Sequence, residues 1–277
     1  MQKLIVRALQ EAQRYGYGLI LNKGELQRLS ANPDVVAQAI ARAFTESSRW
    51  HMSSDERTQV EKIERLRTDL NASTEILETV THQNTPITLT VGDVSRRAST
   101  HPKWALMMFR LIRETKPEKC LELGTCLGVS SAYQAAALQL NGHGSLVTLE
   151  KSEVRVSKAL QHVDKLGLAN VKALPGLFSD TLPSVLSTHT PVEFAFIDGH
   201  HDGHATIEYF RQIAPHTVAG RSILIFDDID WSTDMKQAWQ TIKNDERMYL
   251  TVDLFKWGIG VIGDNHAPKQ SYKLAFN

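Results

Sequence analysis

The chain has 277 residues, of which 42% are hydrophobic and 22% are charged, a composition that supports a folded core and excludes a disordered chain. Its 31 Lys and Arg residues balance 31 Asp and Glu residues, which argues against a nucleic-acid-binding or membrane-surface protein and favours a small or neutral partner. No apolar run reaches the roughly 18 residues of a membrane span, and two cysteines are too few for a disulfide framework, so a cytoplasmic protein is expected.

The first part of the chain has the pattern of a helical region. Apolar residues recur at three- and four-residue spacings in VVAQAIARAF (35–44) and in VEKIERLRTDL (60–70), which is typical of amphipathic helices. Residues 81–103 are rich in Thr, Ser, Pro and Gly, which indicates an interdomain linker or a lid-like loop. We expect an N-terminal helical region (1–85), contributing to a lid or a homodimer interface, and a second domain (86–277).

The second domain alternates short apolar runs with helix-length amphipathic stretches, the pattern of βαβ units on a parallel sheet. Helices are expected in the gaps between the strands. The predicted parallel strands are KCLEL (119–123), SLVTLE (145–150), NVKAL (170–174), EFAFID (193–198) and SILIFD (222–227).

Three further strands are predicted near the end of the chain: MYLTVDLF (248–255), KWGIGVIG (256–263) and QSYKLAF (270–276). The segments between them leave no room for a crossover helix. Successive strands without a crossover must pair antiparallel, so we expect an antiparallel ending to the sheet.

A glycine-rich turn follows the first of these parallel strands in CLELGTCLGVSSAY. Gly124 and Gly128 allow backbone N–H groups and a helix N-terminus to approach a ligand closely, at the turn where open parallel sheets bind nucleotide-like ligands. Glu150 ends the next strand, where a carboxylate can accept hydrogen bonds from both ribose hydroxyls. The glycine spacing departs from G-x-G-x-x-G, and the Glu122 carboxylate disfavours a pyrophosphate. The turn therefore favours S-adenosylmethionine over NAD.

Five motifs occur in order along the chain: STHPKWALMMFRLIRETKPEKCLELGTCLGVSSAY, LVTLEKSEVRVSKAL, GLFSDTLPSVL, FAFIDGHH and ILIFDDIDW. In these motifs the chain resembles the class I S-adenosylmethionine-dependent methyltransferases, in particular the catechol, caffeoyl-CoA and macrocin-type O-methyltransferase group. Residues 60–277 also resemble an uncharacterised bacterial methyltransferase family. The resemblance implies an α/β fold with a Rossmann-like, mostly parallel, seven-stranded sheet whose last hairpin strand is antiparallel.

The resemblance also implies which residues bind the cofactor. Glu122, Gly124 and Gly128 would line its methionine end. Ser130 would meet the carboxylate of that end, and Glu150 would hold the ribose. In GLFSD the glycine matches the family, but Leu177 and Phe178 replace acidic or small residues, so Ser179 is the polar candidate for the adenine loop. The cofactor-binding set is Thr100, Glu122, Gly124, Thr125, Gly128, Ser130, Glu150, Gly176, Ser179 and Asp198.

Carboxylates end two neighbouring predicted strands, as Asp198 in FIDGHHDGH and as Asp227 with Asp228 in ILIFDDIDW. Parallel neighbours present their carboxyl ends to the same crevice, and three carboxylates repel one another unless a cation or proton neutralises them. In the metal-dependent relatives these positions hold a divalent ion, usually Mg²⁺, and oxygen ligands suit it. These three residues are the candidate metal ligands, and a structural role for the acids is the alternative.

The histidines of FIDGHHDGH are candidates for general base. By resemblance, His201 occupies the position of a basic residue in the catechol type, and His200 that of a carboxylate in the macrocin type. Imidazole titrates near neutrality, so either could take a proton from a hydroxyl, with Asp198 as a further catalytic candidate. His204 is expected at the surface, and Trp231 either stacks on a flat acceptor or packs at the rim.

The expected function is S-adenosylmethionine-dependent methylation of a hydroxyl on a small-molecule methyl acceptor, with assistance by Mg²⁺ or another divalent cation left open. One alternative is a metal-independent N-methyltransferase or a methyltransferase of macromolecules. A second, from another class, is a non-catalytic S-adenosylmethionine-binding scaffold or sensor that uses its helical region for interaction.

Overall fold

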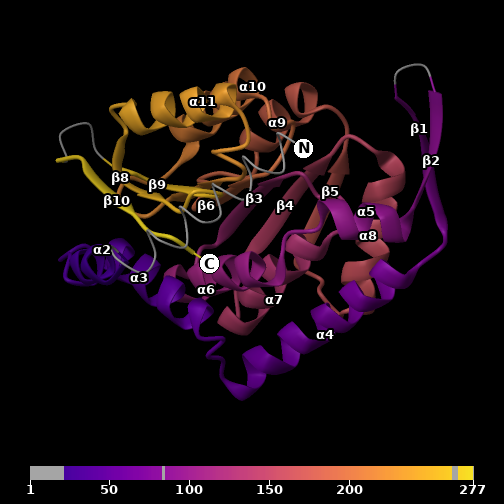
Figure 1. The fold of residues 1–277 in the computed structure, drawn as a ribbon, viewed down its shortest axis with the longest axis horizontal. Coiled ribbons are helices and arrows are strands. Elements are labelled where there is room, and N and C mark those ends of the chain that lie inside the picture. Colours follow the sequence, from indigo (N-terminus) through magenta and orange to yellow (C-terminus); the bar gives the residue numbers. More distant parts are fainter. Residues whose placement is uncertain (1–21, 83–84, 264–267, 277) are drawn as a thin grey trace, which may run out of the picture. The chain divides into compact units, whose positions relative to one another are not determined.

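The computed structural model describes residues 22–82, 85–263 and 268–276 of the chain (Figure 1). The helical pattern predicted for residues 2–21 lies outside the described residues. Among the helices that the structure describes, none combines the length and the apolar character needed to cross a membrane.

The chain divides into two compact units. Unit 1 consists of Met1–Arg49 and Pro191–Asn277, and unit 2 consists of Trp50–Thr190. The boundary expected after residue 85 therefore falls inside unit 2. The first helices of the chain belong to unit 1, together with its last strands.

Unit 2 contains three parallel strands of the main sheet. β3 pairs with β4, and β4 pairs with β5. Parallel neighbours need a crossover connection, and helices supply it here, as the sequence pattern predicted. The strands are β3 (Lys119–Leu123), β4 (Ser145–Glu150) and β5 (Val171–Pro175), and the helices are α7 (Val129–Asn141), α8 (Glu153–Lys165) and α9 (Phe178–Leu186).

A buried ion pair links two further helices of unit 2, α4 (Ser54–Ala72) and α6 (Pro102–Thr115). Glu56 and Ser53 form a capping box at the start of α4, which satisfies N–H groups that a helix leaves unpaired there. Glu56 Oε1 also lies 2.8 Å from Arg110 Nη1 on α6, with both side chains less than a tenth exposed. The pair fixes the start of α4 against α6.

The segment predicted as a linker or loop is instead a β-hairpin followed by a helix. β1 (Ile76–His82) pairs antiparallel with β2 (Thr85–Thr90), and Figure 1 shows the hairpin projecting beyond α5 (Val91–Ala98). Its β-branched threonines and isoleucines favour extended backbone. The Thr and Pro content suggested a loop, but the concentration of β-branched residues in each strand is the signal that was missed.

Unit 1 contains the other five strands of the main sheet, in the order β10-β8-β9-β7-β6. β6 and β7 are parallel, whereas β9 runs antiparallel to both of its neighbours, β7 and β8. The strands are β6 (Phe194–Ile197), β7 (Ile223–Phe226), β8 (Met248–Asp253), β9 (Gly258–Ile262) and β10 (Gln270–Lys273).

The helices of unit 1 cover these strands. α10 and α11 pack side by side on one face (Figure 1), and α2 lies against α3 and β10. Asn22 at the start of α2 exchanges hydrogen bonds with the backbone of Ala275, which joins α2 to the last residues that the structure describes. The helices are α2 (Asn22–Ser30), α3 (Val35–Ser48), α10 (Gly203–Ile213), the short 3₁₀ helix η1 (Ala214–His216) and α11 (Thr233–Asn244).

The predicted fold class is confirmed, with two corrections at the end of the chain. The main sheet has eight described strands, which correspond to the eight strand segments predicted from the sequence pattern, rather than the seven that the resemblance implies. β10 was expected to continue the antiparallel ending, but it pairs in parallel with β8. Since β9 already has β7 and β8 on its two sides, only the outer edge of β8 is available, and a strand that reverses from β9 runs there in the direction of β8.

Candidate functional site

The glycine-rich turn of unit 2 joins β3 to α7 through left-handed backbone. Gly124 has φ +111°, Cys126 φ +49° and Gly128 φ +79°. A Cβ atom at Gly128 would lie 3.0 Å from Cβ of Ala159 on α8. Gly128 is therefore required by its dihedral angle and by the close approach of α8, in addition to any contact with a ligand.

The turn is fastened to the end of β4. The N–H groups of Gly124 and Thr125 donate to the carbonyl of Leu149 at 2.9 and 3.2 Å. The Glu150 carboxylate accepts the N–H of Cys126 at one oxygen and that of Ser152 at the other, both at 3.0 Å. Each oxygen of a carboxylate can accept a second hydrogen bond. Glu150 is thus held in one orientation beside the turn and can still accept hydrogen bonds from a ligand.

Glu122 lies inside unit 2 and is fully buried. Its carboxyl oxygens accept hydrogen bonds from Ser131, from Gln134 at 2.8 Å and from Thr148 at 2.7 Å. Burial raises the pKa of Glu122, and the hydrogen bonds, including one from Ser130, offset this only in part. The carboxyl group therefore links β3, α7 and β4 from within.

Two more residues of the predicted cofactor set join this internal network. The hydroxyls of Thr125 and Thr148 lie 2.6 Å apart, and Ser130 in the first turn of α7 is buried. The structure gives Glu122, Thr125 and Ser130 partners within the protein, and their contact with a cofactor stays a prediction.

The other predicted cofactor residues of unit 2 occupy separate places. Gly176 follows β5 with φ +138°, and its N–H donates to the carbonyl of Glu150 at 2.9 Å, which ties that loop to the end of β4. Ser179 is exposed on α9 and bonds Asp180, while Thr100 lies half-buried just before α6. Of these three, Gly176 is the one fastened to Glu150.

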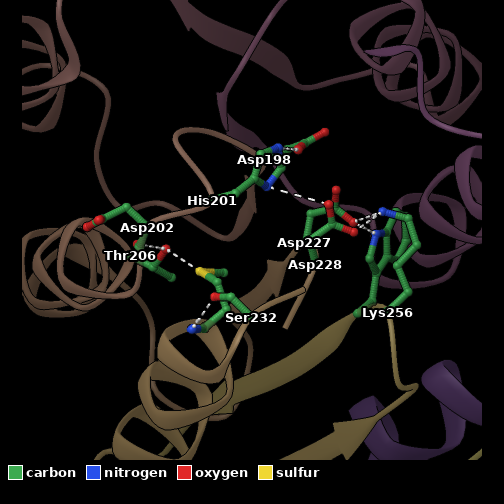
Figure 2. Close-up of polar contacts among 10 residues, drawn as sticks. Asp198, His201, Asp202, Thr206, Asp227, Asp228, Ser232 and Lys256 are labelled. Carbon is green, nitrogen blue, oxygen red and sulfur yellow. Dashed lines mark hydrogen bonds and ion pairs between the residues drawn. The ribbon is translucent and has the colours of Figure 1, made fainter. Parts of the chain in front are cut away.

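In unit 1 the structure brings together the carboxylates predicted at the strand ends (Figure 2). Asp198 follows β6, and Asp227 with Asp228 follows β7. The N–H of Asp227 donates to the carbonyl of Ile197 at 3.0 Å, so the parallel pairing continues up to the acids. We call Asp198, His201, Asp227, Asp228 and Lys256 the carboxylate site.

Sequence reasoning missed Lys256, the cation of the carboxylate site. Its Nζ atom lies 2.5 Å from Asp227 Oδ1 and 2.7 Å from Asp228 Oδ1 (Figure 2). The indole N–H of buried Trp257 donates to the same Asp227 oxygen at 2.6 Å. The signal available was a lysine at the predicted boundary between two antiparallel strands, where a turn must return the chain.

The protonation states follow from burial and neighbouring charge. Burial and the adjacent Asp227 carboxylate raise the pKa of Asp198 well above the usual range of an aspartate. Burial alone would lower the pKa of Lys256, but the carboxylates of Asp227 and Asp228 outweigh it and raise that pKa. The site therefore holds a permanent ammonium between two carboxylates, beside a third carboxyl group that favours its proton.

A divalent metal ion does not fit this arrangement. Asp198, His201 and Asp227 each offer a ligand atom, and these atoms lie within 4.8 Å of one another. However, Lys256 already bonds Asp227 and Asp228, two of the three predicted metal ligands. A divalent ion on those oxygens would face an ammonium group at close range, and like charges repel strongly in a partly buried site.

The two histidines have different surroundings. His200 Nδ1 is 2.6 Å from the hydroxyl of Tyr209, and the two rings stack. His201 instead faces the acids: its Nδ1 is 3.6 Å from Asp228 Oδ2 and its Nε2 is 3.9 Å from Asp198 Oδ1. The exposed ring of Trp231 lies 6.2 Å from the His201 ring. Of the two candidate bases, His201 is the one beside the carboxylates.

Comparison with known proteins agrees with this fold. Residues 121–229 match the family model of a methyltransferase domain. The curated catechol O-methyltransferase of Niastella koreensis is 31% identical over 115 residues, which are 41% of this chain and 50% of that protein. The chain therefore spans half the length of this relative.

Solved structures are similar at lower identity. The O-methyltransferase from Bacillus cereus in complex with SAH superposes with a TM-score of 0.55 at 18% identity, over 74% of this chain and 90% of that one. The SAH-bound methyltransferase PaMTH1 of Podospora anserina gives 0.55 at 17% identity, over 77% and 89%. At such identities the likeness concerns the fold alone.

The chain has a fold similar to that of solved O-methyltransferases, and its residues 121–229 match the family model of a methyltransferase domain. The part that matches the curated relative is similar in sequence to a catechol O-methyltransferase. The resemblance predicted from the sequence motifs is thus confirmed.

Proposed function

We propose that this protein is an S-adenosylmethionine-dependent methyltransferase that methylates a hydroxyl group of a small molecule. The observation that carries the proposal is Glu150, whose carboxylate is oriented by the N–H groups of Cys126 and Ser152 beside the glycine turn. A carboxylate fixed at the end of the second strand suits the paired hydroxyls of a ribose. The methyltransferase domain and the SAH-bound structural neighbours support the same cofactor.

The proposed chemistry is methyl transfer to oxygen. S-adenosylmethionine, when bound, supplies a methyl group on a positively charged sulfur. His201 takes the proton of the acceptor hydroxyl, and the carboxylate of Asp228, with Oδ2 3.6 Å from Nδ1 of the ring, stabilises the resulting imidazolium. The protein contributes the orientation of the reacting groups and the removal of this proton.

A small, flat acceptor is the proposed partner. The equal numbers of acidic and basic residues offer no excess positive charge for a nucleic acid. Trp231, a residue that is 69% exposed and lies beside His201, presents an aromatic surface on which a planar acceptor can stack. The similarity to a catechol O-methyltransferase supports an aromatic hydroxyl compound.

Calorimetric titration with S-adenosylmethionine tests the cofactor. We expect Glu150→Gln to raise the dissociation constant about 10- to 100-fold, because a hydrogen bond to a charged group contributes roughly 1.5–3 kcal/mol. Glu153→Gln is the matched control, since Glu153 is an exposed acid three residues further on, in the first turn of α8. An absence of binding by the wild type, or equal losses in both variants with unchanged unfolding midpoints, would contradict the proposal.

A further inference from the structure

The turn that carries Lys256 in unit 1 is held in place by backbone hydrogen bonds. It joins β8 to β9, with Phe255 in the left-handed region at φ +68°. The N–H of Leu254 donates to the carbonyl of Trp257 at 2.8 Å, and the N–H of Lys256 donates to the carbonyl of Leu254 at 2.9 Å. The N–H of Ile229, just beyond the Asp pair, donates to the carbonyl of Lys256 at 3.0 Å. The lysine backbone is thus fixed to the loop that bears the acids.

The lysine side chain is also held at its end. An ammonium group has three N–H donors. Two of them are taken by Asp227 Oδ1 and Asp228 Oδ1, and the described part of the chain offers no acceptor to the third. Asp227 is buried and the Asp228 side chain is 20% exposed, whereas the Lys256 side chain is 30% exposed, so the lysine is the most exposed of the three side chains.

We propose that Lys256 takes the place of a divalent metal ion, so that methyl transfer at this site is metal-independent and the third ammonium N–H binds the acceptor oxygen. This inference rests on the proposed function. Its basis is the geometry: one resident cation joins the two neighbouring carboxylates that a metal would need, and a turn tied by backbone hydrogen bonds keeps it there.

The Lys256 ammonium should also favour a different class of methyl acceptor from the one that a metal ion favours. A metal ion can coordinate both oxygens of a vicinal diol, whereas one N–H binds a single oxygen. In the proposed step the acceptor O–H bond breaks and its proton passes to His201, the oxygen forms a bond to the methyl carbon, and the S–CH₃ electron pair stays on sulfur. Lys256 stabilises the negative charge that develops on the oxygen. The acceptor class is therefore a hydroxyl compound that needs no adjacent hydroxyl.

Manganese binding to the purified protein tests the inference without reference to activity. We expect the wild type to bind Mn²⁺ more weakly than about 1 mM, the weak end of protein sites for hard cations, and Lys256→Met to bind at least about tenfold more tightly, since two carboxylates lose their cation. Lys236→Met is the matched control, because Lys236 on α11 has a half-exposed side chain and pairs with Asp230 at 2.9 Å. It should bind Mn²⁺ as the wild type does.

Other outcomes overturn the inference. Wild-type binding tighter than about 100 µM that is lost in Asp227→Asn would show a metal site. The wild-type titration decides this point even where Lys256→Met fails to fold, and Lys256→Arg, which keeps the cation, should still exclude Mn²⁺.

Turnover adds a second readout. Methyl transfer that survives EDTA, at similar rates for a monohydroxy and a vicinal dihydroxy phenol, supports the inference, whereas loss with EDTA and recovery with Mg²⁺ contradicts it. If the protein binds S-adenosylmethionine but also binds Mn²⁺ tightly, the inference about Lys256 is wrong and the proposed function stands. A protein that binds no S-adenosylmethionine refutes the proposed function instead.

Discussion

The glycine-turn site of unit 2 and the carboxylate site of unit 1 are built from different forces. The turn site is held by backbone hydrogen bonds and by neutral hydroxyl and amide partners around Glu122. The carboxylate site is held by a lysine between two carboxylates. The first arrangement fixes the course of the backbone, and the second holds the charged side chains of Lys256, Asp227 and Asp228 together. Substitutions should therefore affect the two sites in different ways.

The largest effect is expected at the carboxylate site, from Asp227→Asn. This change leaves Lys256 with one carboxylate and removes the anionic acceptor of Trp257. Breaking a buried ion pair costs about 3 kcal/mol of unfolding free energy, at the low end of the usual range because Lys256 is partly exposed. Urea denaturation measures the loss.

Asp230→Asn provides the comparison for this loss. Asp230 pairs with the half-exposed Lys236 at 2.9 Å, and exposed pairs contribute less than about 1 kcal/mol. Equal losses in the two variants would mean that the Lys256 pair behaves as an ordinary surface ion pair.

A smaller effect, about 2 kcal/mol, is expected at the turn site from Gly128→Ala. The left-handed φ of +79° costs an alanine about 1 kcal/mol, and crowding against Ala159 at 3.0 Å adds a similar amount. Gly142→Ala isolates the first contribution, because Gly142 has the same φ at the other end of α7 and a Cβ atom there would meet nothing within 4 Å. Thermal unfolding of the two variants separates strain from crowding.

A companion variant checks the crowding. Ala159→Gly should cost less stability in the Gly128→Ala background than in the wild type, because it removes the methyl group that the new Cβ meets, and the double-mutant cycle cancels the cost of a glycine inside α8. If the two glycine variants lose equal stability, the close approach of α8 contributes nothing.

The same contrast explains how much could be predicted from the sequence. The strands of the parallel sheet and the glycine turn were predicted within about a residue, because their signals are local: an apolar run, two glycines and an acid at the next strand end. Lys256 was not predicted, because its partners lie 28 and 29 residues away, and only the antiparallel return of β9 beside β7 brings the turn to the acids.

Two other differences have local causes. The β1–β2 hairpin was missed because threonine and proline are also common in loops. His200 contacts Tyr209, whereas His201 faces the carboxyl groups of the carboxylate site. These different directions depend on left-handed backbone at both histidines. Histidine adopts this conformation more readily than most residues, but the sequence does not show where it does so.

The smallest effect is expected from Glu122→Gln, and its pH dependence distinguishes a neutral network from an ionic one. Burial raises the pKa of Glu122 in the folded state. As pH rises above the ordinary glutamate pKa of 4.5, the unfolded chain releases this proton while the folded protein keeps it, so the wild type loses stability, by at most about 1.4 kcal/mol per pH unit. Glutamine has no such proton. The variant should differ little near pH 5 and become the relatively more stable protein, by on the order of 1 kcal/mol, as pH rises.

Urea denaturation of both proteins at several pH values measures this difference, in which the titration of all other groups cancels. Glu153→Gln, at an exposed position, should show no such trend. A flat difference for Glu122→Gln would mean that the buried carboxyl is ionised in the fold, with its charge stabilised by Ser131, Gln134 and Thr148. The turn site would then depend on a fixed charge as the carboxylate site does, and the contrast between the two would lie only in the partners of that charge: neutral donors in unit 2 and the Lys256 ammonium in unit 1.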